Sequence, residues 1–278
     1  MSARRCDDAL LEARRSGIDA LDAQLLMAGA LRTSRSAVIA HGERVLQPAE
    51  QAQWQEWVRR RSSGEPLAYL LGEKEFHGLG LEITDDVLVP RPETELLVDW
   101  ALSLMAGGSD APTVVDLGTG SGAVALAIKH RRPAARVTAT DISLAALRVA
   151  ARNAERLDLE LEFLAGAWWR PAAGRRFHLA VANPPYVAAD DPHLAALAHE
   201  PRGALTPGGD GLAALREIID GADAHLEPGG WLLVEHGFDQ AGAVRDRMTA
   251  AGLTDAQTRT DLADQPRVTA ARRRAATA

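Results

Sequence analysis

The stretch "VVDLGTGSGAVALAI", residues 114–128, joins an apolar segment to a helix-forming segment through a glycine-rich loop. The apolar run before the loop predicts a buried strand, and the run after it predicts a helix. Gly118, Gly120 and Gly122 let the backbone turn sharply and approach a ligand closely. The N-terminus of the helix then points its free N–H groups at that ligand. This strand–loop–helix unit predicts an α/β fold with a ligand site at its turn.

Strands and helices continue to alternate from residue 92 to the C-terminus. Helices are predicted at 92–108, 122–133, 143–157, 211–230 and 242–253. Strands are predicted at 113–118, 136–141, 161–166, 177–185, 231–237, 254–260 and 267–273. This alternation indicates a parallel sheet with helices on both faces, and the short last connection indicates a final antiparallel pair. We therefore predict a seven-stranded, Rossmann-like α/β sheet.

The N-terminal part of the chain has a different pattern. Residues 7–62 are predicted to be helical, and "FHGLGLEITDDVLVP" (76–90) alternates, contains two glycines and predicts a short hairpin. We expect three segments: a helical domain at 1–75, a hairpin linker at 76–90 and the α/β domain at 91–278.

Composition excludes several classes of protein. The chain has 278 residues, 46% of them hydrophobic, and a net charge of −7 that lies entirely after residue 75. Neither part is basic, and the clusters "RRR" at 59–61 and 272–274 are interpreted as solvated faces, so stable nucleic-acid binding is not expected. Cys6 is the only cysteine, which excludes a disulfide framework and a cysteine-rich metal site. No apolar run approaches the ~20 residues that cross a bilayer, so we expect a cytoplasmic enzyme without a metal or a membrane partner.

Two acidic residues accompany the glycine loop. Asp141 ends the second predicted strand, about 20 residues after the loop, where a carboxylate can accept both ribose hydroxyls of a nucleoside. Asp116 lies two residues before the first glycine, and the spacing is G-x-G-x-G rather than the dinucleotide fingerprint G-x-G-x-x-G. This loop resembles that of S-adenosylmethionine-dependent methyltransferases. Trp168 is a candidate wall for the adenine ring, and its neighbour Trp169 competes for that role.

The fourth predicted strand runs into the tetrapeptide Asn183-Pro184-Pro185-Tyr186. The two prolines have no N–H and a fixed φ, and Asn183 is held extended by the proline after it. The result is a stiff corner at the carboxyl end of the sheet, where ligands bind. Tyr186 adds a flat surface for packing a planar group.

Such a corner suits a planar NH₂ group. The Asn183 side chain and the Pro184 carbonyl offer two acceptors that can hold both N–H bonds and direct the nitrogen lone pair at an electrophilic methyl carbon. No general base is required, and the flanking His178 and Asp190 are interpreted as structural or solvated.

The chain resembles the family of bacterial peptide chain release factor glutamine methyltransferases over nearly its whole length. The stretches that carry the resemblance are "GEPLAYLLGEKEFHGL" (64–79), "VLVPRPETELLVDWAL" (87–102), "VVDLGTGSGAVALAI" (114–128), "VANPPYV" (181–187), "WLLVEHG" (231–237) and "QPRVTAARR" (265–273).

The resemblance implies methylation of the glutamine amide nitrogen in the Gly-Gly-Gln loop of class-1 release factors, with the helical domain gripping the release factor. It also places Arg91 to Glu95 near the cofactor pocket and makes Asn183 to Tyr186 the glutamine site. The residues that would bind S-adenosylmethionine are Gly118, Thr119, Gly120, Ser121, Gly122, Asp141, Trp168 and Asn183. One departure is Ala167, which stands where many methyltransferases carry an acidic residue for the adenine amino group.

Three alternatives use the same motifs. A sister family methylates a glutamine of a ribosomal protein, and adenine or guanine methyltransferases share Asn-Pro-Pro-Tyr. The second group needs a basic groove or a base-reading domain, which this charge distribution does not supply. A non-catalytic cofactor-binding protein would not require the intact Asn183–Tyr186 corner.

Overall fold

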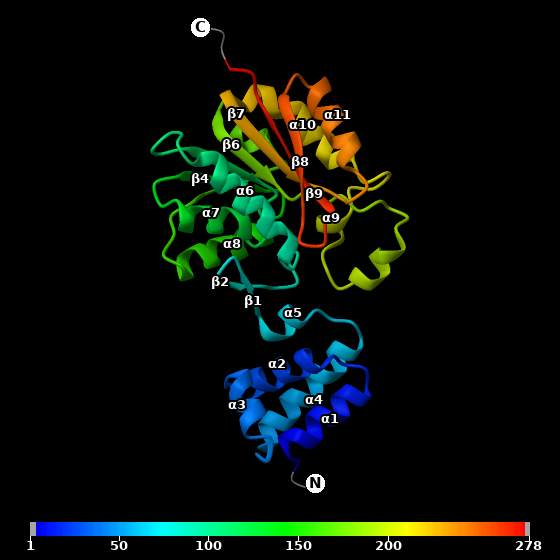
Figure 1. The fold of residues 1–278 in the computed structure, drawn as a ribbon. Coiled ribbons are helices and arrows are strands. Elements are labelled where there is room, and N and C mark those ends of the chain that lie inside the picture. Colours follow the sequence, from blue (N-terminus) through cyan, green and yellow to red (C-terminus); the bar gives the residue numbers. More distant parts are fainter. Residues whose placement is uncertain (1–3, 276–278) are drawn as a thin grey trace. The chain divides into compact units, whose positions relative to one another are not determined.

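In the computed structural model, which describes residues 4–275, these residues form two compact units that divide after residue 73 (Figure 1). The first unit is helical, with α1 (Cys6–Arg15), α2 (Ala20–Ala30), α3 (Arg35–Ala40), α4 (Pro48–Ser62) and α5 (Leu67–Leu71). The second is an α/β unit. Its strands are β1 (Glu73–Phe76), β2 (Leu79–Glu82), β3 (Thr113–Leu117), β4 (Arg136–Asp141), β5 (Glu162–Ala165), β6 (Phe177–Ala182), β7 (Leu226–Glu235), β8 (Thr254–Thr260) and β9 (Pro266–Arg272). Its helices are η1 (Pro92–Thr94), α6 (Glu95–Met105), α7 (Ala123–Arg131), α8 (Leu144–Arg156), η2 (Arg170–Ala172), η3 (Pro192–Leu197), α9 (Arg202–Leu205), α10 (Ala213–His225) and α11 (Ala241–Ala250).

Local signals explain the helical unit. The Asp19 side chain accepts a hydrogen bond from Leu21 N at 2.7 Å and caps α2, and Pro48 begins α4. Trp54 of α4 is 2% exposed, so it belongs to the core.

The arginine cluster 59–61 ends α4 and is engaged by acidic side chains of the same unit. Arg59 pairs with Glu56 at 2.6 Å, Arg61 pairs with Asp22 at 2.8 Å, and Arg60 pairs with Glu65. Cations at a helix C-terminus also complement the helix dipole. These partners give the cluster a structural role.

The predicted hairpin is present, but its range was offset. The paired strands are 73–76 and 79–82, whereas the sequence predicted 76–90. The first strand was missed because "EKEF" is charged and carries almost no alternating apolar pattern. His77 (φ 51°) and Gly78 (φ 82°) form the turn, and two consecutive positive φ values are typical of tight hairpins.

The predicted seven-stranded sheet is confirmed, with the order β5-β4-β3-β6-β7-β9-β8. β3 to β7 run parallel, and β9 runs antiparallel to both of its neighbours, β7 and β8. The strand order reverses between β3 and β6, and ligands bind beyond the carboxyl ends of the strands at such a reversal. The segments that follow β3, β4, β5 and β6 therefore meet at one edge.

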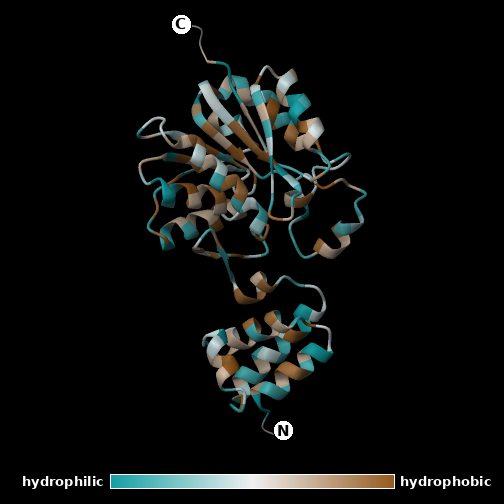
Figure 2. Cartoon of the chain, viewed as in Figure 1, coloured by the Kyte–Doolittle hydropathy of each residue, from teal (hydrophilic) through white to brown (hydrophobic). Residues whose placement is uncertain are grey.

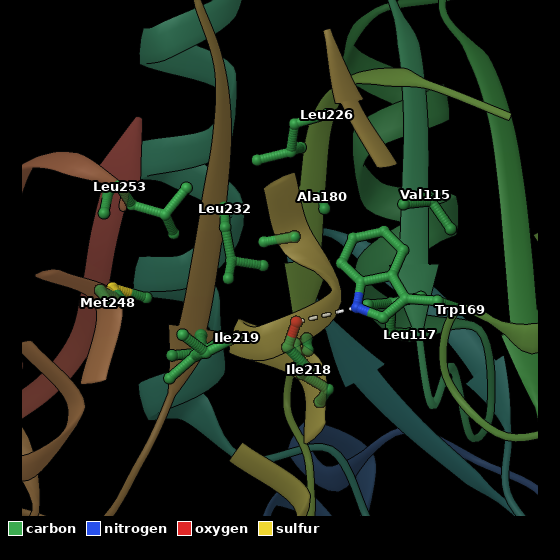
Figure 3. Packing of buried hydrophobic residues seen from close by; sticks show 14 of the residues in the cluster. Val115, Leu117, Trp169, Ala180, Ile218, Ile219, Leu226, Leu232, Met248 and Leu253 are labelled. Carbon is green, nitrogen blue, oxygen red and sulfur yellow. Dashed lines mark hydrogen bonds between the residues drawn. The ribbon is translucent and has the colours of Figure 1, made fainter. Parts of the chain in front are cut away.

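The core lies between the sheet and its helices. The strands at the centre of the sheet carry mainly hydrophobic residues (Figure 2). On one face, side chains of β3, β6 and β7 pack with those of α10 and α11, among them Leu117, Ile218 and Met248 (Figure 3). This packing fixes the strand ends that carry the candidate site.

Two segments differ from the sequence prediction. β7 begins at Leu226 rather than 231, because "LEPGG" continues as an irregular strand with a register shift against β6 instead of ending the helix. Residues 192–205 contain the short helices η3 and α9, which the sequence did not predict because the segment has no periodic apolar pattern.

Candidate active site

A cavity of about 300 Å³ opens at the carboxyl ends of β3, β4, β5 and β6. Nine of the predicted site residues line it: Gly118, Thr119, Gly120, Ser121, Asp141, Trp168, Asn183, Pro184 and Pro185. Two others, Gly122 and Tyr186, do not. Segments 86–94 and 201–204 complete the wall.

The glycine loop turns back on β4 as it leaves β3. Gly118 N and Thr119 N both donate to the Thr140 carbonyl at 2.9 Å. Gly118 (φ 79°) and Gly120 (φ 56°) hold left-handed conformations that favour glycine. A Cβ on Gly118 would lie 3.0 Å from the Trp168 ring, so this glycine also makes room for the indole.

Gly122 serves packing rather than the cavity. It caps α7 with φ 85°, and a Cβ there would lie 2.9 Å from Leu126 and 3.2 Å from Ala150 of α8. The third glycine therefore lets α7 and α8 approach each other.

Asp141 connects the loop to α8. Its Oδ2 accepts from Gly120 N at 2.9 Å and its Oδ1 from Ser143 N at 2.8 Å. Burial raises the pKa of Asp141, and the backbone hydrogen bonds oppose this effect. A carboxylate oxygen has two lone pairs, so each oxygen keeps one acceptor site for a ligand.

Asp116 lies at the floor of the cavity and is 2% exposed. Its Oδ2 accepts from the Thr119 hydroxyl at 2.7 Å, which ties the loop to the strand before it. Burial raises the pKa of Asp116 to about 7, and the hydrogen bond from Thr119 opposes the shift. This carboxyl therefore titrates near neutral pH, beside the glycine loop.

The structure separates the two tryptophans. Trp168 lines the cavity, with a left-handed backbone (φ 47°). Trp169 is 5% exposed and donates its Nε1–H to the Ile218 carbonyl at 2.8 Å (Figure 3). Its ring also stacks on that of His225. Trp169 is thus a core residue, and Trp168 is the indole that a ligand can touch.

Asn183 follows β6 and lines the cavity, and a hydrogen bond fixes the orientation of its carboxamide. Its Nδ2 donates to the hydroxyl of Thr94, another cavity residue, at 3.1 Å. Its Oδ1 accepts none of the hydrogen bonds found among residues 4–275, and the same is true of the Pro184 carbonyl. Two acceptor oxygens of this corner are therefore available for a ligand.

Tyr186 turns away from the cavity. Its ring packs against the core, its hydroxyl donates to Glu235 Oε1 at 3.1 Å, and its carbonyl accepts from Gln240 Nε2 at 2.9 Å. Burial, followed by the charge of Glu235, raises the pKa of Tyr186. In this structure the tyrosine anchors the corner and gives the cavity no flat surface.

The segment around Arg91 is held by Glu200, a buried side chain that sequence reasoning missed. Glu200 Oε1 pairs with Arg91 Nη2, and Oε2 accepts from Val89 N at 3.1 Å. Pro90 and Thr94 consequently form part of the cavity wall. Partners more than 100 positions apart leave no local sequence signal.

Neither flanking candidate base lies at the cavity. His178 is exposed at the start of β6, the opposite end of the strand, and bonds the Thr113 hydroxyl at 2.7 Å. Asp190 is exposed. Within residues 4–275, no cluster of three or more His, Cys, Asp or Glu side chains is placed to hold a metal ion. None of the helices in that range is both long and apolar enough to cross a bilayer.

Comparisons with known proteins agree with this architecture. A family model described as the PrmC N-terminal domain matches residues 4–72, and the methyltransferase small domain matches residues 94–212. A solved methyltransferase from Pyrococcus furiosus has a similar fold, with a TM-score of 0.55 and 18% identity, over 71% of this chain and 90% of that chain. The α/β unit therefore has a methyltransferase fold.

Curated relatives are similar over almost the full length. The release factor glutamine methyltransferase of Burkholderia pseudomallei is 50% identical over 268 residues, covering 93% of this chain and 94% of that protein. The release factor glutamine methyltransferase of Bordetella pertussis is 48% identical over 255 residues, covering 91% of this chain and 94% of that protein. The chain belongs to the release factor glutamine methyltransferase family.

Proposed function

We propose that this protein uses S-adenosylmethionine to methylate the side-chain amide nitrogen of the Gly-Gly-Gln glutamine in class-1 peptide chain release factors, in the cytoplasm. The observation that carries the proposal is the orientation of Asn183. Its nitrogen is engaged by Thr94, and its oxygen is left, with the Pro184 carbonyl, to accept two N–H bonds. Family membership supports a release factor glutamine as the substrate.

The residues around the cavity fit the cofactor. Asp141 keeps one free lone pair on each oxygen for the two ribose hydroxyls, and the Trp168 indole offers a face for the adenine ring. Gly118 and Gly120 present backbone to the cavity, and a side chain on Gly118 would meet the Trp168 ring. Ala167 lines the same cavity and provides no acid for the adenine amino group, so stacking and backbone groups carry that recognition. When bound, S-adenosylmethionine supplies an electrophilic methyl group.

The Asn183–Pro184 corner holds the glutamine amide. Its two oxygens accept both N–H bonds, which fixes the plane of the amide and aims the nitrogen lone pair across the cavity. As positive charge develops on that nitrogen, the two oxygens attract it more strongly than in the ground state. The proton can leave after transfer, so no side chain needs to act as a base.

We assign recognition of the release factor to the helical unit. The helical unit matches the PrmC N-terminal domain, and its arginine cluster at 59–61 is engaged by acids rather than arranged for phosphates. These features support a protein substrate over nucleic acid.

A parallel assay tests the proposal. Purified chain is incubated with methyl-labelled S-adenosylmethionine and, separately, with a class-1 release factor, ribosomal proteins and duplex DNA. We expect label on the release factor, located by mass spectrometry on the Gly-Gly-Gln glutamine. Label on DNA or a ribosomal protein but not on the release factor would overturn the proposal. The variant His178→Ala should keep full activity in this assay, because His178 lies at the end of β6 opposite the cavity.

A further inference from the structure

A buried carboxyl stands behind the Asn-Pro-Pro-Tyr corner. Glu235 ends β7 and is 1% exposed. β6 and β7 are parallel, and Ala182 lies opposite Val234. Asn183 and Glu235 are the next residues along these two strands. A glutamate in this position needs a reason, since an unpaired buried charge is unfavourable.

Glu235 is linked to both ends of the corner, directly at Tyr186 and through Thr94 at Asn183. Its Oε1 accepts the Tyr186 hydroxyl, and the Thr94 hydroxyl, which holds Asn183, lies close enough to lower the pKa of Glu235. Burial has the larger, opposite effect and raises that pKa to about 7, while Arg267 lowers it and Glu93 raises it. Among residues 4–275, Glu235 Oε2 is the buried side-chain oxygen without a hydrogen-bond partner.

Thr94 can link Asn183 to Glu235, because a hydroxyl can accept one hydrogen bond and donate another. Its oxygen accepts from Asn183 Nδ2, so its own proton is free for a second acceptor. Donating that proton to Glu235 Oε2 would satisfy the unpartnered oxygen. A carboxylate acting on the hydroxyl also makes the hydroxyl oxygen a better acceptor for Asn183.

The orientation of Asn183 matters because its two ends are nearly equal in shape. A carboxamide that turned over would present NH₂ to the NH₂ of the substrate, and two donors cannot bond each other. Only a partner that accepts, and does not donate, toward Asn183 Nδ2 excludes that state.

We propose that Glu235 and Thr94 are positioning residues, which act through Asn183 by holding its carboxamide oxygen toward the cavity. The expected effect on methylation rests on the proposed function, whereas the orientation of Asn183 rests on the geometry alone. A purely structural role for Glu235 at the end of β7 would leave the orientation of Asn183 unchanged when Glu235 is replaced.

The test uses four variants of the full chain. Thr94→Val removes the hydroxyl and keeps the shape, Thr94→Ser keeps the hydroxyl, and Glu235→Leu removes the carboxyl. Thr138→Val is the matched control, because the buried Thr138 also donates to a glutamate, Glu162, at 2.8 Å but does so away from the cavity.

Two readouts are needed for each variant. The first is the NMR signal of the Asn183 side-chain NH₂ in the chain bound to S-adenosylhomocysteine, identified by its loss in Asn183→Ala, with its hydrogen-exchange rate. The second is kcat for release factor methylation, beside the Kd for S-adenosylhomocysteine.

For Thr94→Val and Glu235→Leu we expect a shifted Asn183 signal and faster exchange. We also expect kcat to fall about 10- to 100-fold while the Kd for S-adenosylhomocysteine changes by less than about threefold. Thr94→Ser should behave within about twofold of wild type, because the hydroxyl is restored. Thr138→Val should leave both readouts unchanged.

An Asn183 signal that is unaltered in Thr94→Val would overturn the inference, whatever happens to kcat. If Glu235→Leu does not fold, Glu235→Gln, which keeps the shape of the side chain and removes the charge, tests the role of Glu235 by the same two readouts. A wild-type chain that binds the cofactor product but does not methylate release factor would remove the proposed function, and the NMR readout would still decide whether Thr94 and Glu235 orient Asn183.

Discussion

Replacing Asp141 by Asn should separate cofactor affinity from folding stability. Asp141 accepts two backbone N–H bonds, from Gly120 and Ser143, with different oxygens. Asn is neutral and has one acceptor oxygen, so its NH₂ must face one of these N–H donors. Neither ribose hydroxyl then keeps a charged acceptor, and one of them loses its acceptor altogether. A hydrogen bond to a charged group contributes about 1.5–3 kcal/mol, so we expect roughly a 10- to 150-fold weaker Kd.

The pH dependence of stability should also differ between the two proteins. Burial raises the pKa of the folded Asp141 carboxyl, so wild type loses stability as pH rises through that pKa, whereas Asp141→Asn does not titrate and gains stability relative to wild type as pH rises. Isothermal titration with S-adenosylhomocysteine measures the affinity, and thermal unfolding at several pH values measures the stability difference. Asp19→Asn is the matched control, because Asp19 also accepts from the N–H two residues ahead but lies in the helical unit. A Kd for Asp141→Asn within threefold of wild type would refute the ribose role.

Three further predictions concern the same unit. Gly122→Ala should lower the free energy of unfolding, measured by urea unfolding, by about 1–3 kcal/mol, because a Cβ is strained at φ 85° and would also collide with side chains of α7 and α8. Gly174→Ala is the control and should lower it less, because Gly174 has a similar φ of 75° but no atom within 4 Å of the added Cβ. As pH rises from 5 to 8, the free energy of unfolding of Asp116→Asn should increase by about 3 kcal/mol relative to that of wild type, as measured by urea unfolding at both pH values. The sign follows because the folded-state pKa of Asp116, about 7, lies above its ordinary value, so the folded wild type binds more protons than the unfolded chain and loses stability as pH rises through this window. An equal pH dependence of the two proteins would contradict this. Trp168→Ala should weaken S-adenosylhomocysteine binding about 5- to 150-fold, the range for loss of a base–aromatic stack, whereas Trp169→Phe should chiefly lower stability; the reverse result would exchange their roles.

Much of the fold could be predicted because it is encoded in local patterns. Alternating strands and helices gave the sheet, and the order of the motifs placed the glycine loop, Asp141 and Asn183 at its carboxyl edge. The weak points were segments without such patterns. The charged strand β1 and the irregular start of β7 carry no clear periodicity, so their bounds were wrong.

The site was less predictable because its partners come from distant segments. Tyr186 was expected to face a substrate, but its hydroxyl is drawn into the core by Glu235, 49 positions away. The sequence does not distinguish Trp168 from Trp169, because only the tertiary structure places the first ring at the cavity and the second in the core, bonded to the Ile218 carbonyl. Thr94, 89 positions from Asn183, has no motif of its own that predicts the contact.

The most direct test of the account is a crystal structure of the chain with S-adenosylhomocysteine and a Gly-Gly-Gln peptide. We expect the glutamine amide nitrogen within about 3 Å of both Asn183 Oδ1 and the Pro184 carbonyl oxygen, with Asn183 Nδ2 still on Thr94. A glutamine amide bound away from these two oxygens, or held by the Asn183 nitrogen, would contradict it.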